Sequence, residues 1–326
     1  MRLPPKLLAS VSVVLLSVAA ISGCSTLDRW QREAIFQTEA AARLQGREAP
    51  AGVEQYDVAV PGGGETGADT LRFWYLAADD AAGAPTVLYL HGARHNLYGN
   101  ASRLERLRDL GFNVLALDYR GFGRSTRILP TEASAIEDAR LAFAELERRE
   151  SQPQRRLLYG YSLGGAVAIA LAQQVDGLAG VVVESSFTSI TDVVRTMRWG
   201  WVPFINIAVT QEFNSLSRIG QVNEPLLFLH GTADGIVPHE MSDRLHAAAR
   251  AVPADMKRVV KIEGASHRGA MSLDPETYRK ALSEFVSLAS GRAQALARNA
   301  MPVGGGASIG STSGTAAASV AGGALR

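Results

Sequence analysis

Short apolar runs in the middle of the chain constrain its fold more than any other feature. From residue 86 onward these runs lack the polar–apolar alternation of a strand with one solvent-exposed face. They are expected to be strands buried on both faces, as in a parallel sheet that helices cover on each side. The runs are Thr86–Leu90, Asn113–Leu117, Leu157–Tyr159, Val181–Val183, Leu226–Leu229 and Arg258–Ile262.

Helical patterns separate these runs. The clearest spans Glu132–Arg149, which has apolar residues on one face and Thr131 in the position of an N-cap. Further helices are predicted over Gly165–Gln174 and Glu240–Ala251. Alternation of strand and helix predicts an α/β fold, with a mostly parallel central sheet flanked by helices.

One segment carries a motif for nucleophilic catalysis. Gly160-Tyr161-Ser162-Leu163-Gly164 fits the pattern G-x-S-x-G, which places a serine on a sharp turn between a strand and a helix. The turn lifts the hydroxyl clear of the sheet and aims the helix N-terminus at developing negative charge. Residues 306–310 fit the same pattern, but no strand precedes them and no helix former follows. Context therefore selects Ser162.

An acid and a histidine follow Ser162 in the order that this kind of nucleophile requires. Asp234 comes shortly after one buried run, and His267 shortly after the next. Because parallel strands end at the same edge of a sheet, both side chains are expected there with Ser162. We therefore predict a catalytic triad of Ser162, Asp234 and His267. Asp118 precedes the serine and is expected to shape its own loop, while His230 is expected to support the loop of Asp234.

The oxyanion hole of such a site needs two backbone N–H groups. One is that of Leu163, which directly follows the nucleophile. The other is expected from Ala93, in the turn that ends the strand at 86–90. Catalysis of this kind uses side chains and backbone groups alone, so neither a metal nor a cofactor is expected.

Four segments carry a resemblance to a known family. They are Leu88–Gly92, Asp118–Ser125, Gly160–Gly165 and Leu229–Asp234. Together they resemble the α/β-hydrolase superfamily over about residues 53–289, and within it the small-lid serine hydrolases of the Bem46-like and serine-aminopeptidase-like groups. The resemblance implies the α/β-hydrolase fold. The chain departs from it at 93–96, where Ala-Arg-His-Asn stands in place of the usual Asn-Ala-Gly-Asn. That departure bears on the pocket entrance and on substrate preference.

A longer connection, residues 185–224, separates two strands of the central sheet and is expected to form a small lid. One interpretation is a lid that only shields the edge of the sheet. The other is an apolar pocket for an acyl group over Ser162. The aromatic residues of this connection are Trp199, Trp201, Phe204 and Phe213.

The N-terminus has the order of a secretory signal. Arg2 and Lys6 precede an uncharged apolar stretch that is shorter than the ~20 residues of a membrane span. Ile21-Ser22-Gly23-Cys24 resembles a bacterial lipobox, in which the cysteine becomes the acylated first residue. The alternative is an ordinary signal peptide, but Cys24 is the only cysteine of the chain, which favours lipidation. The lipobox resemblance implies that Ser25, in place of an Asp at the next position, directs the protein to the outer membrane of the cell envelope, on its periplasmic side.

These features predict one folded domain with extensions at both ends. The segment after Cys24 is expected to be a linker or an amphipathic helix, which either packs on the domain or lies on the membrane. The last segment is rich in Gly, Ala, Ser and Thr, and it lacks the apolar residues that would offset ordering entropy. The predicted parts are the signal peptide 1–23, the linker or helix 24–50, the hydrolase domain 51–290, which opens with an antiparallel hairpin of 56–60 and 71–76, and the disordered tail 291–326.

Composition excludes several other classes of protein. Lys and Arg number 33 against 32 Asp and Glu, a net charge of +1, so nothing indicates a nucleic-acid partner. A single cysteine excludes an intramolecular disulfide and a Cys-rich zinc site. We therefore expect a membrane-anchored serine hydrolase that acts on a small-molecule acyl ester. The alternatives are a peptidase or acyltransferase with the same triad, and a non-catalytic envelope lipoprotein that uses the fold as a binding module.

Overall fold

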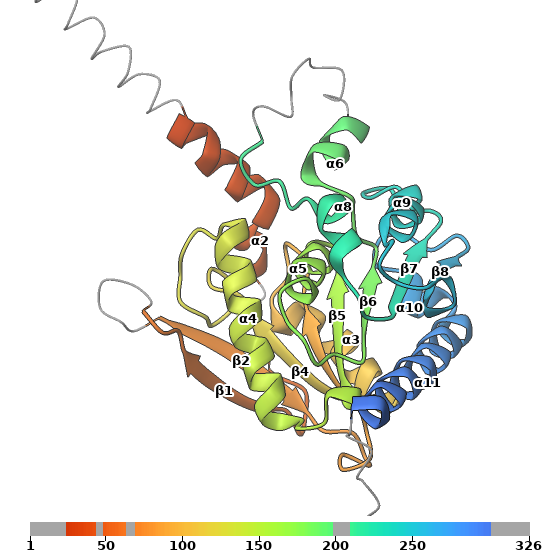
Figure 1. Ribbon diagram of the computed structural model, residues 1–326. Coiled ribbons are helices and arrows are strands. Elements are labelled where there is room, and N and C mark those ends of the chain that lie inside the picture. Colours follow the sequence, from red (N-terminus) through yellow and green to blue (C-terminus); the bar gives the residue numbers. More distant parts are fainter. Residues whose placement is uncertain (1–23, 44–47, 63–68, 198–208, 301–326) are drawn as a thin grey trace, which may run out of the picture.

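An eight-stranded sheet runs through the protein (Figure 1), in the order β1-β2-β4-β3-β5-β6-β7-β8. The computed structural model describes residues 24–43, 48–62, 69–197 and 209–300. Strand β2 is antiparallel to both of its neighbours, β1 and β4, and every other pair is parallel. The strands are β1 (Glu54–Ala59), β2 (Thr70–Leu76), β3 (Thr86–Leu90), β4 (Asn113–Asp118), β5 (Arg156–Tyr161), β6 (Gly180–Glu184), β7 (Leu226–Gly231) and β8 (Lys257–Ile262).

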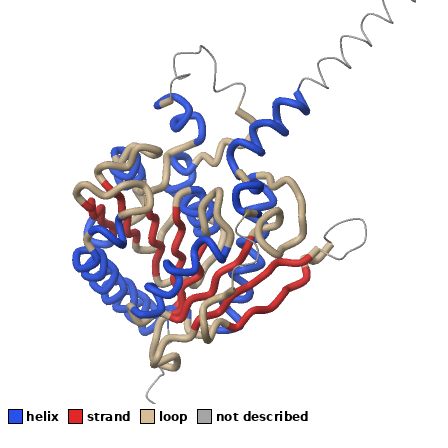
Figure 2. The backbone as a smooth tube through the Cα atoms, turned by 180° about the vertical axis from the view of Figure 1, so that it is seen from behind, coloured by secondary structure: helices blue, strands red, loops and turns tan. Residues whose placement is uncertain are grey.

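Helices cover both faces of the sheet. One face packs against α4, α5 and α9, which Figure 1 shows in front of the strands, and the other packs against α3 and α11. From behind (Figure 2), the β1–β2 pair lies at the opposite end of the sheet from α11. The helices are α2 (Thr38–Ala42), α3 (Leu97–Asp109), α4 (Glu132–Arg149), α5 (Leu163–Ala172), α6 (Ile190–Thr196), α8 (Ser215–Arg218), α9 (Glu240–Ala248), α10 (Ala270–Leu273) and α11 (Pro275–Ala300), together with a helical stretch at residues 24–36.

The central strands are apolar throughout because each of their faces meets a layer of helices. In β3, Leu88 and Leu90 belong to the core that contains α4 and α5, whereas Val87 and Tyr89 belong to the core that contains α3 and α11. All five residues of β3 are buried. This two-sided burial confirms the predicted α/β fold with its mostly parallel sheet and helices on both faces.

The elements themselves were largely predictable. Strand β3 and helix α4 have the predicted bounds, and Thr131 caps α4 by accepting a hydrogen bond from the Ser134 N–H. The antiparallel β1–β2 pair at the edge is also as expected. Helices α3 (Leu97–Asp109) and α11 (Pro275–Ala300) had no predicted counterpart, and neither did the short helices α6, α8 and α10.

The structure changes one predicted boundary and decides an alternative at the other end. For 24–50, where a linker or an amphipathic helix was expected, the stretch 24–36 is helical and its Phe36 is fully buried in the core, so the helix packs on the domain. The predicted tail does not begin at 291, because α11 continues to Ala300 through a segment rich in the helix formers Ala, Leu, Arg and Gln. The predicted signal peptide 1–23 and the rest of the tail, 301–326, lie outside the described residues.

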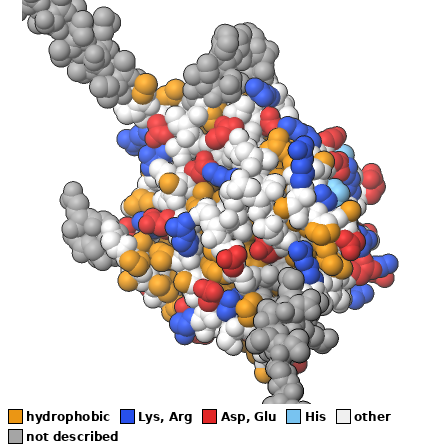
Figure 3. Space-filling model, in the orientation of Figure 1, with side chains coloured by type: hydrophobic (Ala, Val, Ile, Leu, Met, Phe, Trp, Pro, Cys, Tyr) orange, Lys and Arg blue, Asp and Glu red, His pale blue; other side chains and the backbone are white. Residues whose placement is uncertain are grey.

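The surface carries both signs of charge close together. On the face shown in Figure 3, Lys and Arg side chains are interspersed with Asp and Glu side chains. This mixture agrees with the near-zero net charge of +1.

Candidate active site

Ser162 sits on the sharp turn between β5 and α5. Its backbone has φ 54° and ψ −118°, a conformation that residues other than glycine adopt at a cost of about 1–3 kcal/mol. Backbone hydrogen bonds hold the turn: the Ser162 N–H donates to the Glu184 carbonyl at 2.8 Å, and the Gly165 N–H donates to the Ser162 carbonyl at 2.9 Å. The Ser186 hydroxyl donates to the same Ser162 carbonyl at 2.8 Å. The strained serine is thus held from both sides.

The glycines of the motif are required by close packing around this turn. A Cβ on Gly160 would lie 2.3 Å from the Gly164 carbonyl oxygen. A Cβ on Gly164 would lie 2.0 Å from the Leu90 carbonyl oxygen, at the end of β3. Both distances are far below van der Waals contact, so only glycine lets α5 approach the strands this closely.

The three residues predicted as a triad lie together in the structure. His267 Nε2 is 3.0 Å from Ser162 Oγ, and His267 Nδ1 is 2.7 Å from Asp234 Oδ2. Asp234 follows β7 and His267 follows β8, so both come from loops at the carboxyl edge of the sheet. The other Asp234 oxygen, Oδ1, accepts the N–H groups of Ile236 and Val237, each at 2.9 Å. The carboxylate therefore has a fixed orientation.

These contacts determine where the imidazole proton sits. An ionised Asp234 can only accept, so Nδ1 of His267 donates to it and Nε2 is left to accept the Ser162 hydroxyl proton. Burial opposes ionisation of Asp234, but the hydrogen bonds from His230 and His267 outweigh it and hold the pKa of Asp234 well below its usual range. Asp234 thus stays charged and holds His267 as the tautomer that a general base requires.

His230 is a second histidine on the same carboxylate. It is fully buried, and its Nε2 lies 3.1 Å from Asp234 Oδ2 and 3.1 Å from the Val237 carbonyl. Since both of these oxygens accept, Nε2 carries the proton and Nδ1 accepts the Ser242 hydroxyl at 2.7 Å. His230 therefore supports the Asp234 loop, as the sequence indicated.

The two residues predicted to form an oxyanion hole through their N–H groups belong to segments next to Ser162. Leu163 is the first residue of α5, and Ala93 belongs to the loop after β3. That loop is in close contact with the sharp turn of Gly160–Gly164, the elbow that carries Ser162, since a Cβ on Gly92 would lie 3.1 Å from Ser162 Cβ. Among the described residues, neither the Leu163 N–H nor the Ala93 N–H has a hydrogen-bond acceptor. Both N–H groups are thus unoccupied donors, as an oxyanion hole requires.

His91 and Asp118 form a buried pair beneath that loop. His91 Nε2 lies 3.8 Å from Asp118 Oδ1, and both side chains are fully buried. Burial lowers the pKa of His91 to about 4 and raises the pKa of Asp118 to about 7. Asp118 Oδ1 also accepts the N–H of Leu97, the first residue of α3, so the carboxylate holds a second segment besides the loop that follows β4.

Tyr161 contacts His267 directly, a contact that the sequence pattern did not predict. Its hydroxyl donates to the His267 carbonyl at 3.1 Å, and its ring centroid is 5.4 Å from that of the imidazole. On the ring face, the Arg103 guanidinium carbon lies 4.4 Å from the centroid. Tyr161 therefore helps to fix the position of His267.

A buried charged network lies next to the elbow and was also not predicted. Glu184, the last residue of β6, accepts hydrogen bonds from Arg103 and Tyr159, and from Tyr278 at 3.0 Å. Arg103 and Glu184 are both buried, so each charge compensates the other. The available signal was a single acid at the end of an otherwise apolar strand.

The described part of the predicted lid consists of two arms. The first contains α6, and the second runs from residue 209 to α8. Phe213 is fully buried, with its ring 5.9 Å from that of Phe36. The other three aromatic residues of the predicted acyl pocket, Trp199, Trp201 and Phe204, lie outside the described residues.

Cys24, the predicted lipidation site, is exposed at the start of the helical stretch 24–36. Within the described part of the chain, no helix combines the length and apolar character that crossing a membrane requires.

Known proteins resemble this chain in sequence and in fold. Residues 83–218 match the family described as "Serine aminopeptidase, S33". An uncharacterised protein of Mycobacterium tuberculosis is 34 % identical over 218 residues, 67 % of this chain and 75 % of that protein. Protein bem46 of Schizosaccharomyces pombe is 34 % identical over 168 residues, 50 % of this chain and 56 % of bem46. The esterase Pf2001 of Pyrococcus furiosus superposes with a TM-score of 0.58 at 22 % identity, covering 74 % of this chain and 96 % of the esterase.

A helix-flanked parallel sheet with a serine elbow at its carboxyl edge defines the class of α/β hydrolases. The chain belongs to the α/β-hydrolase superfamily. The resemblance that the four sequence segments carry is thereby confirmed.

Proposed function

We propose that the protein is a serine hydrolase that cleaves carboxylic esters. His267 Nε2 removes the Ser162 proton as Oγ attacks the ester carbonyl carbon, and the N–H groups of Leu163 and Ala93 bind the resulting oxyanion. The protonated His267 then donates its proton to the departing alkoxide, which leaves as an alcohol. Water, deprotonated by the same imidazole, hydrolyses the acyl-Ser162 ester to the carboxylic acid and restores the serine.

The geometry of His267 carries this proposal. Its two ring nitrogens lie 3.0 Å from Ser162 Oγ and 2.7 Å from Asp234 Oδ2, the arrangement of a base between a nucleophile and an orienting acid. A purely structural histidine would not need a serine on a strained turn as its partner. The non-catalytic alternative leaves the strain at Ser162 without a function.

A fluorophosphonate probe, which phosphonylates an activated serine, tests this function. The purified wild-type protein should be labelled, and Ser162→Ala should not. The chain offers a matched control in Ser308, which occupies the other G-x-S-x-G segment, so Ser308→Ala should be labelled like the wild type. Wild-type labelling no faster than that of Ser162→Ala would overturn the enzyme proposal.

The choice of an ester rests on the fold shared with the Pyrococcus furiosus esterase. The description of the matching family, a serine aminopeptidase, supports an amide-cleaving alternative with the same triad. An acyltransferase would differ only in the acceptor of the acyl group. Rates on matched esters, thioesters and peptide amides, with and without an added alcohol acceptor, separate these three activities.

We further propose that Cys24 is acylated and anchors the protein to the cell envelope, with the outer membrane favoured. The exposed position of Cys24 supports this assignment. Two apolar side chains near the start of the adjoining helix are also exposed, Leu27 by 40 % and Trp30 by 64 %, which supports contact with lipid at the anchored end of a helix that otherwise packs on the domain.

A further inference from the structure

We propose that the helix of residues 24–36 is a positioning element of the active site. Together with α2, it fixes the loop His91–Asn96, which presents the Ala93 N–H, and the lid segment Thr210–Phe213. The inference rests on the proposed hydrolase function for its kinetic consequence, but the contacts themselves do not depend on that function.

Backbone carbonyls of the N-terminal segment accept hydrogen bonds from the two loop residues Arg94 and Asn96, which follow Ala93. The Phe36 carbonyl accepts the Arg94 N–H at 3.2 Å, and the Ala41 carbonyl accepts the Asn96 side-chain amide at 3.1 Å. Arg94 has φ 71°, a left-handed conformation that is unfavourable for arginine. The bond from Phe36 therefore stabilises a strained residue directly after the proposed oxyanion donor.

The Phe36 side chain packs between the loop region and the lid arm. Its ring lies 6.5 Å from Phe122 and 5.9 Å from Phe213, centroid to centroid. Phe122 in turn lies 4.9 Å from the ring of His91, at the start of the loop. Phe36 is fully buried, so these contacts are part of the core.

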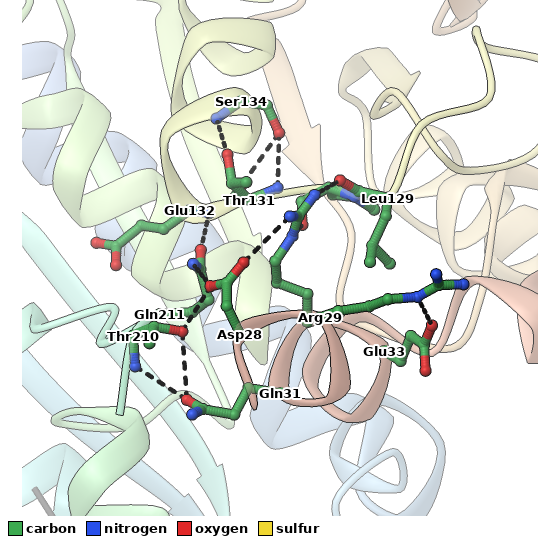
Figure 4. Close-up of polar contacts among 12 residues, drawn as sticks. Asp28, Arg29, Gln31, Glu33, Leu129, Thr131, Glu132, Ser134, Thr210 and Gln211 are labelled. Atoms are coloured by element: carbon green, nitrogen blue, oxygen red, sulfur yellow. Dashed lines mark hydrogen bonds and ion pairs between the residues drawn. The ribbon is translucent and has the colours of Figure 1, made fainter. Parts of the chain in front are cut away.

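Polar contacts fasten the same helix to two other segments (Figure 4). Arg32 donates to the Leu129 carbonyl and, at 2.9 Å, to the Pro130 carbonyl, just before α4. Asp28 accepts the Thr210 hydroxyl at 2.7 Å, and Gln31 accepts the Thr210 N–H at 2.9 Å. Each contact joins the helix to chain that is distant in sequence.

The second lid arm, at Gln211 and Phe213, connects helix 24–36 to the start of α4 by hydrogen bonds. Gln211 donates to Asp28 at 3.0 Å and accepts the Glu132 N–H at 2.7 Å. Glu132 then accepts the Phe213 N–H at 2.8 Å. Helix 24–36, the lid arm and the start of α4 thus form one hydrogen-bonded unit around the loop of Ala93.

A neighbouring arginine on the same helix provides a control. Within the described part of the chain, Arg29 pairs only with Glu33, one turn along, and its side chain is 75 % exposed, against 22 % for Arg32. Removing Arg29 deletes a charge from the helix without touching the loop or the lid arm. Such exposed pairs contribute about 0.5 kcal/mol or less to stability.

The experiment compares Arg32→Ala and Asn96→Ser with Arg29→Ala in the full-length protein. Serine at 96 can still cap α3, as Asn96 does through the Gly99 N–H, but it cannot reach the Ala41 carbonyl. A displaced oxyanion donor affects the transition state, so kcat should fall about tenfold or more in both variants while KM changes by less than about threefold. Arg29→Ala should keep the wild-type kcat, and Arg32→Lys, which retains a donor, should recover part of the loss.

Hydrogen exchange gives a readout that does not need turnover. Below the unfolding temperature, the Arg94 and Thr210 amides should exchange faster in Arg32→Ala, but not in Arg29→Ala. Wild-type kcat and unchanged exchange in Arg32→Ala and Asn96→Ser would overturn the inference, as would equal losses in Arg29→Ala. If the wild type itself is not labelled by the fluorophosphonate, the hydrolase proposal fails, and the exchange comparison still tests the positioning contacts.

Discussion

Asp234 accepts hydrogen bonds from two histidines on one oxygen atom. His267 reaches Oδ2 at 2.7 Å from the solvent side of the site, and the buried His230 reaches it at 3.1 Å. Of these two histidines, only His267 contacts the Ser162 hydroxyl. His230 instead ties Asp234 to Ser242 on α9, so it determines where the acid sits rather than taking part in proton transfer.

Replacing His230 should therefore impair both stability and catalysis. In His230→Ala, Asp234 and Ser242 each lose a buried partner, which should cost about 1–3 kcal/mol of unfolding free energy. A shifted Asp234 misplaces His267, so kcat should drop about tenfold. Thermal unfolding and ester hydrolysis measure the two effects. The control is His246→Ala, at a half-buried histidine on α9, the helix that also carries Ser242. An equal loss of kcat in this variant would contradict the prediction.

The buried pair His91 and Asp118 should offset each other's effect on acid stability. The pKa of His91 falls from 6.5 to about 4, so the unfolded chain takes up a proton that folded His91 refuses, and stability is lost as pH falls from 6.5 to 4. The pKa of Asp118 rises from 3.8 to about 7, so the folded chain keeps a proton, and stability increases as pH falls from 7 to 3.8. Between about pH 4 and 6.5, the contributions of His91 and Asp118 to the unfolding free energy therefore change with pH in opposite directions.

The variant Asp118→Asn should expose the slope of His91 alone. Asparagine keeps an oxygen for the Leu97 N–H but does not titrate. As the pH is lowered from 6.5 to 4, the unfolding free energy of the variant should decrease by about 1.4 kcal/mol per pH unit relative to that of the wild type. Urea unfolding at several pH values gives both curves, and parallel curves would show that the two groups do not oppose each other.

At the level of elements, the elbow depends on the absence of a side chain at Gly164. Gly164→Ala puts a methyl group 2.0 Å from the Leu90 carbonyl, which should cost about 3 kcal/mol of stability and abolish labelling of Ser162. Gly291 is a matched control inside helix α11, with nothing within 4 Å of an added Cβ. Gly291→Ala should stabilise the protein by about 0.5–1 kcal/mol, because alanine is the better helix former. Chemical denaturation compares the two, and a tolerated Gly164→Ala would contradict this account of the elbow.

The elements that could be predicted from sequence are those whose pattern is local. Strand β3 is apolar throughout and α4 has a cap and one apolar face, and both have the predicted bounds. Helix α3 was missed because its buried positions include Asn100 and Arg103, which bond to Tyr89 and Glu184 rather than forming an apolar stripe. Chain order and strand context were enough to find Ser162, Asp234 and His267, which lie together in the structure.

At the level of the whole molecule, the contacts of helix 24–36 could not be read from sequence. Arg32 is held by the carbonyls of Leu129 and Pro130, and Arg94 by that of Phe36, and a backbone acceptor leaves no signature in residue type. The pattern of 24–50 left open whether its helix packs on the domain, the commoner case, or lies on the membrane. The burial of Phe36 and the bonds from Arg32 to the carbonyls before α4 show that it packs on the domain.

The same helix begins at the proposed anchor, which makes the anchor testable for the whole protein. Without the cysteine thiol no acyl chain can be attached, so Cys24→Ser should move the protein from the membrane fraction to the soluble fraction. Sedimentation after salt washing, followed by immunoblotting, measures the distribution. The helix keeps its contacts in this variant, so probe labelling of Ser162 should persist. Unchanged sedimentation would remove the lipoprotein proposal and leave the hydrolase proposal intact.

The long sequence separation of these contacts has a consequence for the order of folding. Helix 24–36 bonds to carbonyls 97 and 98 positions further on and to Thr210 at separations of 179 and 182. Helix 24–36 is therefore expected to be among the last elements to dock during folding, because its partners around residues 129–130 and 210 must fold before it can bind them. We expect refolding protein to form the turn of Ser162 before the loop of Ala93 is fixed, so that hydrolytic activity returns only once helix 24–36 has docked.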